Sequence, residues 1–383
     1  MRFLRADKVF NGEDHLPGHP LLVLDARGTL LDILQGQEVD EGRIEKLEGV
    51  ITPGFINAHC HLELSHLLGK TEQHTGLPNF GKQVITQRNA ISNEEAAEHA
   101  KSANAAMWRN GIVAVGDISN GDSSFGEKAG SNIFYHTFIE LIGLNPAASE
   151  TIFNQGLALS ETLSDFNLRG SLAPHAPYST SKQLIGQIAA YNFGNGTPFS
   201  IHNQESAEED KFFMGEKNGF EALYGFLNLD ISWFKAPGCS SFKSYADGLS
   251  PGNSILVHNT VTRESDLAHA ASKNIYWCFC PNANLYIEDA LPHFDIFKDR
   301  KRLIIGTDSL ASNEQLDLVS EANTILNATS IFSSEELLGC MTKNGARALG
   351  IDQEFGSLLI GKNAGLNLIA LENKKIKFLK KII

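Results

Sequence analysis

The chain has 383 residues, which is enough for one large domain or two and for a sizeable hydrophobic core. A hydrophobic content of 42% and a charged content of 20% are typical of a globular protein. The formal net charge of −13 argues against partners that need a basic face, namely nucleic acid and anionic membranes.

Nothing in the sequence indicates export or membrane insertion. The first residues lack the apolar core of a signal peptide, and no run of about 18 apolar residues follows. The five cysteines are scattered and form no Cys-x-x-Cys pair, so a disulfide framework and a cysteine-based zinc site are not expected. These features favour a cytoplasmic protein.

Both ends of the chain predict short strands. Apolar runs at residues 8–10, 20–24 and 30–34 alternate with turns, and two similar runs follow at 356–361 and 366–371. Neither end is large enough to bury a core alone. We therefore expect residues 1–50 and 353–383 to pair into one small β-sandwich domain.

Between the two ends, strand and helix signals alternate. After the first strand we expect a loop containing Gly69, Gly76, Pro78 and Gly81, and then a helix over 94–110. Further helices are predicted over 181–191, 263–273, 315–327 and 334–349. Eight strand-like runs are found, at 55–56, 112–115, 133–139, 170–173, 199–201, 255–257, 275–279 and 303–305.

Eight βα units predict a closed (β/α)8 TIM barrel over residues 51–352. The competing fold is an open doubly wound sheet, which usually carries a phosphate-binding loop. Gly121 and Gly126 have the spacing of such a loop, but the lysine, Lys128, comes one position late and no Ser or Thr follows it.

The first barrel strand carries a His-x-His pair. Side chains alternate along a strand, so His59 and His61 point the same way, as two imidazoles that bind one metal ion must. Two histidines at this spacing also occur by chance, and the other strand ends decide between the two interpretations.

Polar residues follow the apolar runs of four further strands. His175, His202, His258 and Asp308 lie where a barrel places its functional residues, at the carboxyl ends of the strands. One of them alone, such as His258, would more often be a hydrogen-bonded core histidine. Together they predict a catalytic site in which His59, His61, His202 and Asp308 hold a divalent ion with a position left open for water.

Glu205 comes three residues after one of these ligands, where it could carry protons. Its alternative role is that of an acid at a helix N-terminus, which is our interpretation of Glu208, Glu209 and Asp210. A bound divalent ion lowers the pKa of its water from about 15.7 to roughly 7, so the predicted nucleophile is hydroxide.

Taken together, these motifs resemble the amidohydrolase superfamily, in its branch of nucleoside and nucleobase deaminases. The resemblance extends over essentially the whole chain, and is carried by Pro53-Gly-Phe-Ile-Asn-Ala-His59-Cys-His61, Pro174-His175-Ala-Pro-Tyr178, His202-x-x-Glu205, His258, Cys280-Pro-Asn-Ala-Asn284 and Gly306-Thr-Asp308-Ser-x-Ala-Ser312-Asn313.

The resemblance implies one metal ion, zinc or in some relatives iron, because the bridging lysine of dinuclear members is missing from the stretch 172–175. It also implies roles for five residues. Asp308 would accept a proton from the attacking water, His258 would orient that water, and Glu205 would protonate the ring nitrogen. His175 and Ser312 match positions that contact the substrate.

The substrate is expected to be an adenine-type nucleoside such as aminodeoxyfutalosine, 5′-methylthioadenosine or adenosine. Relatives that act on S-adenosylhomocysteine commonly have an arginine just after the third strand, where this chain has Glu140, and in that segment it looks closer to aminodeoxyfutalosine deaminases. Two alternatives stay open: hydrolysis of guanine, another nucleobase, a pterin or a cyclic amide, and a barrel that serves as a non-catalytic scaffold. A homodimer is a habit of the family.

Overall fold

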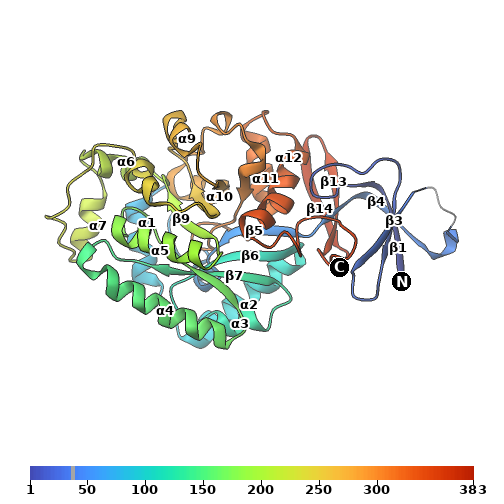
Figure 1. Cartoon of the computed structure of the whole chain (residues 1–383), viewed down its shortest axis with the longest axis horizontal. Coiled ribbons are helices and arrows are strands. Elements are labelled where there is room, and N and C mark those ends of the chain that lie inside the picture. The colour runs from blue at the N-terminus through green and yellow to red at the C-terminus, as the bar shows by residue number, and fades with distance from the viewer. Residues whose placement is uncertain (36–38) are drawn as a thin grey trace.

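The structure is a computed structural model that describes residues 1–35 and 39–383 (Figure 1). A large body of strands and helices adjoins a smaller β-rich part, and both chain termini lie in the smaller part. Within the described residues, no helix combines the length and the apolar character needed to cross a membrane.

The large body is a (β/α)8 barrel, as predicted. Its strands form two four-stranded parallel sheets in the orders β5-β6-β7-β8 and β9-β10-β11-β12. They are β5 (Phe55–Cys60), β6 (Ile112–Ser119), β7 (Phe134–Leu141), β8 (Arg169–Pro174), β9 (Phe199–Asn203), β10 (Ser254–His258), β11 (Ile275–Phe279) and β12 (Leu303–Ile305).

Backbone hydrogen bonds join the two sheets at both seams. At one seam the amide of His202 donates to the carbonyl of His175 over 3.0 Å. At the other, the amides of Thr307 and Asp308 both donate to the carbonyl of His59, over 3.0 and 3.1 Å. The seams therefore lie at residues predicted to form the functional site.

All eight predicted strands are present. β5, β6, β9, β10, β11 and β12 are buried at every position, which is typical of parallel strands covered on both faces. Their apolar runs were therefore a reliable signal, although several strands extend further toward the site than the runs themselves.

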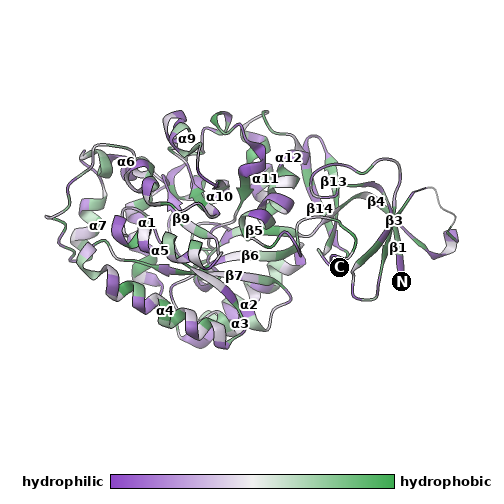
Figure 2. Cartoon of the chain, viewed as in Figure 1, coloured by the Kyte–Doolittle hydropathy of each residue, from purple (hydrophilic) through white to green (hydrophobic). Residues whose placement is uncertain are grey.

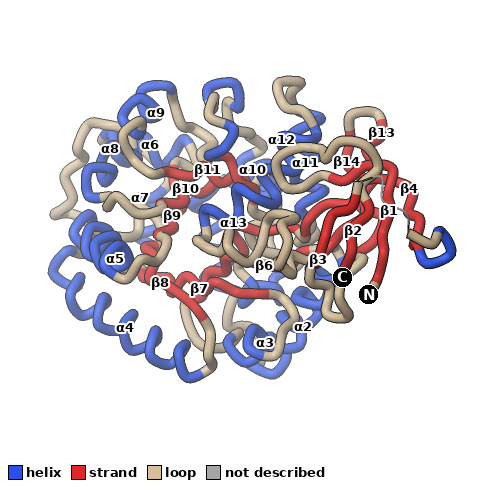
Figure 3. The backbone as a smooth tube through the Cα atoms, turned by 45° about the vertical axis from the view of Figure 1, so that its right-hand side comes forward, coloured by secondary structure: helices blue, strands red, loops and turns tan. Residues whose placement is uncertain are grey.

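Helices cover the outside of the barrel (Figures 1 and 3), and along them hydrophilic and hydrophobic residues alternate (Figure 2). The predicted helices correspond to α2 (Asn93–Arg109), α5 (Lys182–Gly194), α9 (Glu264–Ala270), α11 (Leu318–Ala328) and a last segment. That segment consists of α12 (Ser334–Gly339), a π-helical stretch (Cys340–Asn344) and α13 (Gly345–Ala348).

One predicted loop is wrong, because the stretch with Pro78 and Gly81 contains helix α1 (Leu77–Gln87). Pro78 lies in the first turn of the helix. Backbone N–H groups there have no partner within the helix, so a proline, which lacks the N–H, costs no hydrogen bond. The sequence analysis did not identify α3 (Phe125–Ala129), α4 (Ser149–Asp165), α7 (Phe220–Phe226), α8 (Ser241–Tyr245) and α10 (Pro281–Glu288). Of α6 (Ala207–Met214) it identified only the acidic first turn.

The chain ends build a six-stranded mixed sheet in the order β14-β13-β4-β1-β2-β3, so the predicted pairing of the two ends is confirmed. Its strands are β1 (Arg2–Val9), β2 (Leu21–Leu24), β3 (Leu30–Leu34), β4 (Ile44–Pro53), β13 (Leu366–Glu372) and β14 (Lys375–Lys381). Side chains from both halves of the sheet, among them Leu4, Leu22, Ile51 and Leu366, pack into one core.

We propose that the domains divide as expected, into 1–50 with 353–383 and 51–352, and residues 36–38 lie outside the described part. β4 runs across the first boundary to Pro53. The turn after it needs Gly54, since an added Cβ would lie 2.4 Å from a methyl carbon of Val113. The amide of Gly54 is within hydrogen-bond distance of the carbonyls of Ala364 and Gly365, which ties the two parts together.

Candidate metal centre and substrate cavity

The four predicted metal ligands meet at the carboxyl ends of the strands. His59 belongs to β5, His61 follows that strand, His202 belongs to β9 and Asp308 follows β12. The Nε2 atom of His61 lies 3.2 Å from Nε2 of His59 and 3.2 Å from Nε2 of His202. Oδ1 of Asp308 lies 3.5 Å from Nε2 of His59 and 3.4 Å from Nε2 of His61.

The donor atoms fit a divalent cation. Nδ1 of His202 lies 2.7 Å from the carbonyl oxygen of His175, which can only accept, so Nδ1 carries the proton and Nε2 presents its lone pair. Burial lowers the pKa of His61 to about 3 and holds the pKa of His202 well below its usual value, so both rings are neutral. Neutral imidazoles beside a carboxylate are the ligands that zinc and similar ions prefer.

The carboxylate of Asp308 stays ionised in this setting. Burial alone would raise its pKa, but the surrounding histidines, above all His59, outweigh burial and hold the pKa well below its usual value. The hydroxyl of Ser312 donates to Oδ2 over 2.5 Å, so one carboxylate oxygen is fixed while Oδ1 faces the imidazoles.

His258 lies at the same centre. Ligand atoms of His59, His202, His258 and Asp308 are all within 4.8 Å of one another. Nδ1 of His258 lies 2.8 Å from Oδ1 of Asn284, which fixes the ring, and Nε2 lies 3.6 Å from the carboxylate of Glu205. This places an imidazole and a buried acid side by side.

The backbone at these strand ends is strained. His258 has a φ of 76° and Asp308 a φ of 57°, in the left-handed region that non-glycine residues seldom adopt. Gln204 and Asn259, with φ values of 47° and 60°, share this conformation. Such strain is common at functional sites, where it directs side chains into the cavity.

Glu205 is suited to handle protons. Its side chain is buried, and burial raises its pKa well above the usual value, so the acid form is favoured. Glu209, in the first turn of α6, accepts hydrogen bonds of 3.1 Å from the amides of Gln204 and Glu205 and so holds this loop in place.

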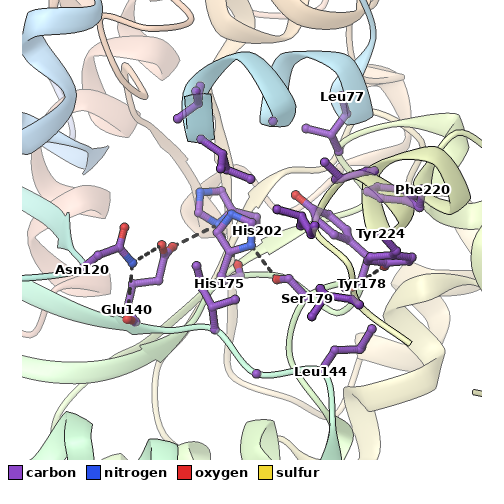
Figure 4. Close-up of a pocket in the computed structure, with 18 of the residues that line it drawn as sticks. Leu77, Asn120, Glu140, Leu144, His175, Tyr178, Ser179, His202, Phe220 and Tyr224 are labelled. Carbon is purple, nitrogen blue, oxygen red and sulfur yellow. Dashed lines mark hydrogen bonds and ion pairs between the residues drawn. The ribbon is translucent and has the colours of Figure 1, made fainter. Parts of the chain in front are cut away.

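A cavity of about 410 Å³ opens from the metal centre (Figure 4). Its lining includes His61, His175, His202, His258, Glu205 and Asp308. The far part is apolar and comes from α1, α7, the loop after α7 and the loops after β7 and β8. Its residues are Leu77, Phe80, Val84, Leu144, Tyr178, Phe220, Leu223, Tyr224, Leu227, Ile231 and Trp233.

The two predicted substrate contacts lie in different positions. His175 lines the cavity, with Nδ1 at 2.6 Å from the hydroxyl oxygen of Ser179. Ser312 is fully buried behind Asp308, and the cavity lining in the described part of the chain includes Ser309 instead. Contact between Ser312 and a substrate stays a prediction.

Several cavity residues were missed by the sequence analysis. Arg88, Asn120 and Glu140 form a polar wall, and of these Glu140 had been noticed only as the replacement of an arginine. The role of Asn284 in fixing His258 was also missed, although Asn284 belongs to a motif that the sequence displays.

Comparisons with known proteins show which proteins the chain resembles. The sequence model of a protein family described as the amidohydrolase family matches residues 50–382 of this chain. The adenosine deaminase of Helicobacter pylori is 26% identical to the chain over 336 residues, which is 86% of this chain and 80% of the relative.

Two solved structures share the fold. Helicobacter pylori aminofutalosine deaminase in complex with methylthio-coformycin superimposes with a TM-score of 0.81 at 22% identity, over 100% of both chains. An adenosine deaminase from Xanthomonas campestris with bound zinc gives a TM-score of 0.72 at 22% identity, over 97% of this chain and 85% of that one.

Proposed function

This chain belongs to the amidohydrolase family, and from that premise we propose that it is a metal-dependent hydrolase that releases ammonia from an adenine-type nucleoside. The observation that carries the proposal is the convergence of His59, His61, His202 and Asp308 at one end of a cavity that also contains Glu205 and His258.

In this proposal the four converging residues hold one divalent ion, and zinc is the ion we propose, in keeping with the relative that contains it. Such an ion, when bound, supplies Lewis acidity that brings the pKa of water from about 15.7 to roughly 7. Asp308 accepts a proton from the attacking water, and His258 orients that water.

Glu205 then completes the proton transfers. As a buried acid it donates a proton to the ring nitrogen next to the attacked carbon and regains one from the hydroxyl group added to that carbon. The proton that Asp308 took from the water passes, with the help of Glu205, to the departing amino group, which leaves as ammonia. His175 contacts the substrate from the end of β8, and Ser312 contributes through the oxygen of Asp308 that it holds.

The size and character of the cavity support a nucleoside over a free base. A free purine or pterin would occupy only the part next to the metal centre, whereas the apolar part between α1 and α7 suits a further substituent. The chain has Glu140, and no arginine, at the end of β7. We therefore propose substrates with an apolar 5′ group, such as 5′-methylthioadenosine, and aminodeoxyfutalosine or adenosine as further candidates.

We further propose that the enzyme acts in the cytoplasm on a small-molecule substrate, that it does not bind nucleic acid, and that it forms a homodimer. The net charge of −13 supports the proposal on nucleic acid, because phosphate backbones attract basic surfaces.

The decisive experiment is a deamination panel. Zinc-loaded protein is incubated with 5′-methylthioadenosine, aminodeoxyfutalosine, adenosine, guanine and a pterin, and ammonia and the ultraviolet spectrum are followed. We expect turnover of the nucleosides and little of the free bases. Turnover of guanine or the pterin alone would favour the nucleobase alternative. No turnover together with less than one metal ion per chain would favour the scaffold.

A further inference from the structure

The polar wall of the cavity contains a carboxylate oxygen without a partner. Glu140, the seventh residue of β7, is only 6% exposed and lines the cavity. Its Oε2 accepts a hydrogen bond of 2.8 Å from the side-chain amide of Asn120, whereas Oε1 has no hydrogen-bond partner among the described residues. A buried acceptor left unpaired is costly, so it calls for an explanation such as a catalytic role or a bound water, ion or other ligand.

The neighbours of Glu140 fix which way it faces. Arg88 donates to the amide oxygen of Asn120 over 3.3 Å and to Glu63 over 3.2 Å, and the backbone amide of Asn120 donates to Glu63 over 3.1 Å. The side-chain NH₂ of Asn120 therefore has to point at Glu140, which holds Oε2 and leaves Oε1 directed toward His202 and the cavity (Figure 4).

His202 does not satisfy this oxygen. Its Nδ1 lies 3.7 Å from Oε1, beyond hydrogen-bond distance, and its proton is already given to the carbonyl of His175 at 2.7 Å. Arg88 is paired with Glu63, so it offers no full positive charge to Glu140 either. What Oε1 lacks is a donor, and the cavity is where a donor can enter.

The position of Glu140 in the barrel indicates which donor. Of the proton-handling pair, Glu205 follows β9 and His258 ends β10, whereas Glu140 lies near the end of β7. His175, which follows β8, lies between them. A nucleoside whose base is held at Glu205 directs its ribose away from the reacting amino group. With its 5′ group in the apolar part of the cavity, the 2′- and 3′-hydroxyls remain for the polar wall.

We propose that Glu140 is a specificity-determining residue that accepts a hydrogen bond from the 2′,3′-diol of the substrate ribose. This inference rests on the proposed nucleoside deaminase function. A site built to bond a hydroxyl rejects an analogue without it, because the buried acceptor is then left unpaired. The enzyme therefore distinguishes ribonucleosides from dideoxynucleosides through Oε1 of this carboxylate.

The test compares adenosine with 2′,3′-dideoxyadenosine as substrates of the zinc-loaded full chain. For the wild-type protein we expect kcat/KM to be about ten- to a hundredfold lower for the dideoxynucleoside, which is what leaving a buried acceptor unpaired costs. In Glu140→Gln the amide oxygen can keep the bond from Asn120 while an NH₂ faces the cavity. In this variant kcat/KM for adenosine falls by a similar factor, mainly because KM rises. For the dideoxynucleoside, kcat/KM changes little.

Controls separate this role from others. Glu127→Gln is the matched variant, since Glu127 also accepts a bond from an asparagine amide, that of Asn104, but lies outside the cavity lining. It should leave both rates unchanged. Metal content of Glu140→Gln, measured by elemental analysis, should stay at one ion per chain.

Three outcomes would overturn the inference. These are equal wild-type rates on the two substrates, an equal loss on both in Glu140→Gln, or loss of metal from that variant, which would assign Glu140 to the support of His202. The first needs no variant and so does not depend on folding of a mutant. Absence of turnover with every nucleoside, despite bound zinc, would instead count against the proposed function itself.

Discussion

Glu205 is the residue on which proton transfer should depend most directly. It is buried and 3.6 Å from Nε2 of His258, and it is not one of the four predicted ligands. We expect Glu205→Gln to lower kcat by about 10²–10⁴-fold, because an amide cannot deliver the proton, while zinc content stays unchanged. Steady-state kinetics and metal analysis on the same preparation check this.

A neighbouring acid provides the control for that prediction. Glu208 lies three residues further on, pairs with Lys211 and accepts a bond from the amide of Gly219. Glu208→Gln should keep kcat within about twofold, since a surface pair contributes little. Equal losses in the two variants would assign the effect to the folding of the loop.

Sequence reasoning found the site residues that follow apolar runs. His59, His202 and Asp308 each lie at or just after the end of a strand. The barrel brings the carboxyl ends of its strands together on one face, and this does not depend on the conformation of the loops. Glu140 and Asn120 were not assigned a role, because their contacts depend on where Arg88 lies. Arg88 immediately follows α1, which the sequence analysis predicted to be a loop.

Between β6 and α3 a fully buried ion pair supports the site from behind. Nζ of Lys128 lies 2.5 Å from Oδ2 of Asp117, and Oδ1 of Asp117 accepts the amide of Leu62, the residue after His61. We expect Lys128→Met to lower the free energy of unfolding by about 3–5 kcal/mol, since it leaves an uncompensated buried charge.

The double variant Asp117→Asn, Lys128→Met is the informative comparison. It removes both charges but keeps an acceptor for the amide of Leu62. Its stability should return to within about 2 kcal/mol of wild type, because a neutral pair avoids the desolvation penalty. Urea unfolding of all three proteins measures the difference, and additive losses would contradict the coupling.

At the scale of elements, strands were predicted better than helices for a physical reason. The barrel strands are apolar on both faces and stand out in the sequence, whereas α1 and α7 pack one side onto a cavity and expose the other. In α1, Pro78 and Gly81 resemble a turn, and packing against α7 and α10 decides in favour of a helix.

For the whole molecule, the joint between the terminal sheet and the barrel contains a poorly placed charge. Lys381 of β14 lies with Nζ 3.6 Å from the ring centre of Trp108 in α2 and has no hydrogen-bond partner among the described residues. Burial lowers the pKa of Lys381 to about 8. The cation–π contact offsets part of that burial cost, so we expect Lys381→Met to stabilise the protein at pH 7 by about 1 kcal/mol.

The stabilisation that Lys381→Met brings should decrease as the pH rises. Below pH 8 the lysine is charged in both states, so the burial cost is fully present. Between about pH 8 and 10.5 the unfolded chain binds more protons than the folded one, so wild-type stability rises with pH relative to the variant. Urea unfolding at pH 7 and pH 10 should show the advantage shrinking, and the exposed Lys377→Met serves as control. An advantage that grows with pH would contradict this account.

The two seams of the barrel have a consequence for how the enzyme comes into being. One half-barrel brings His59 and His61, the other brings His202 and Asp308, and the carbonyl of His59 itself closes one junction. Neither half can assemble a working centre in isolation. Closure of the barrel is therefore what brings the four predicted ligands together, and a cation bound by all four would stabilise the closed barrel.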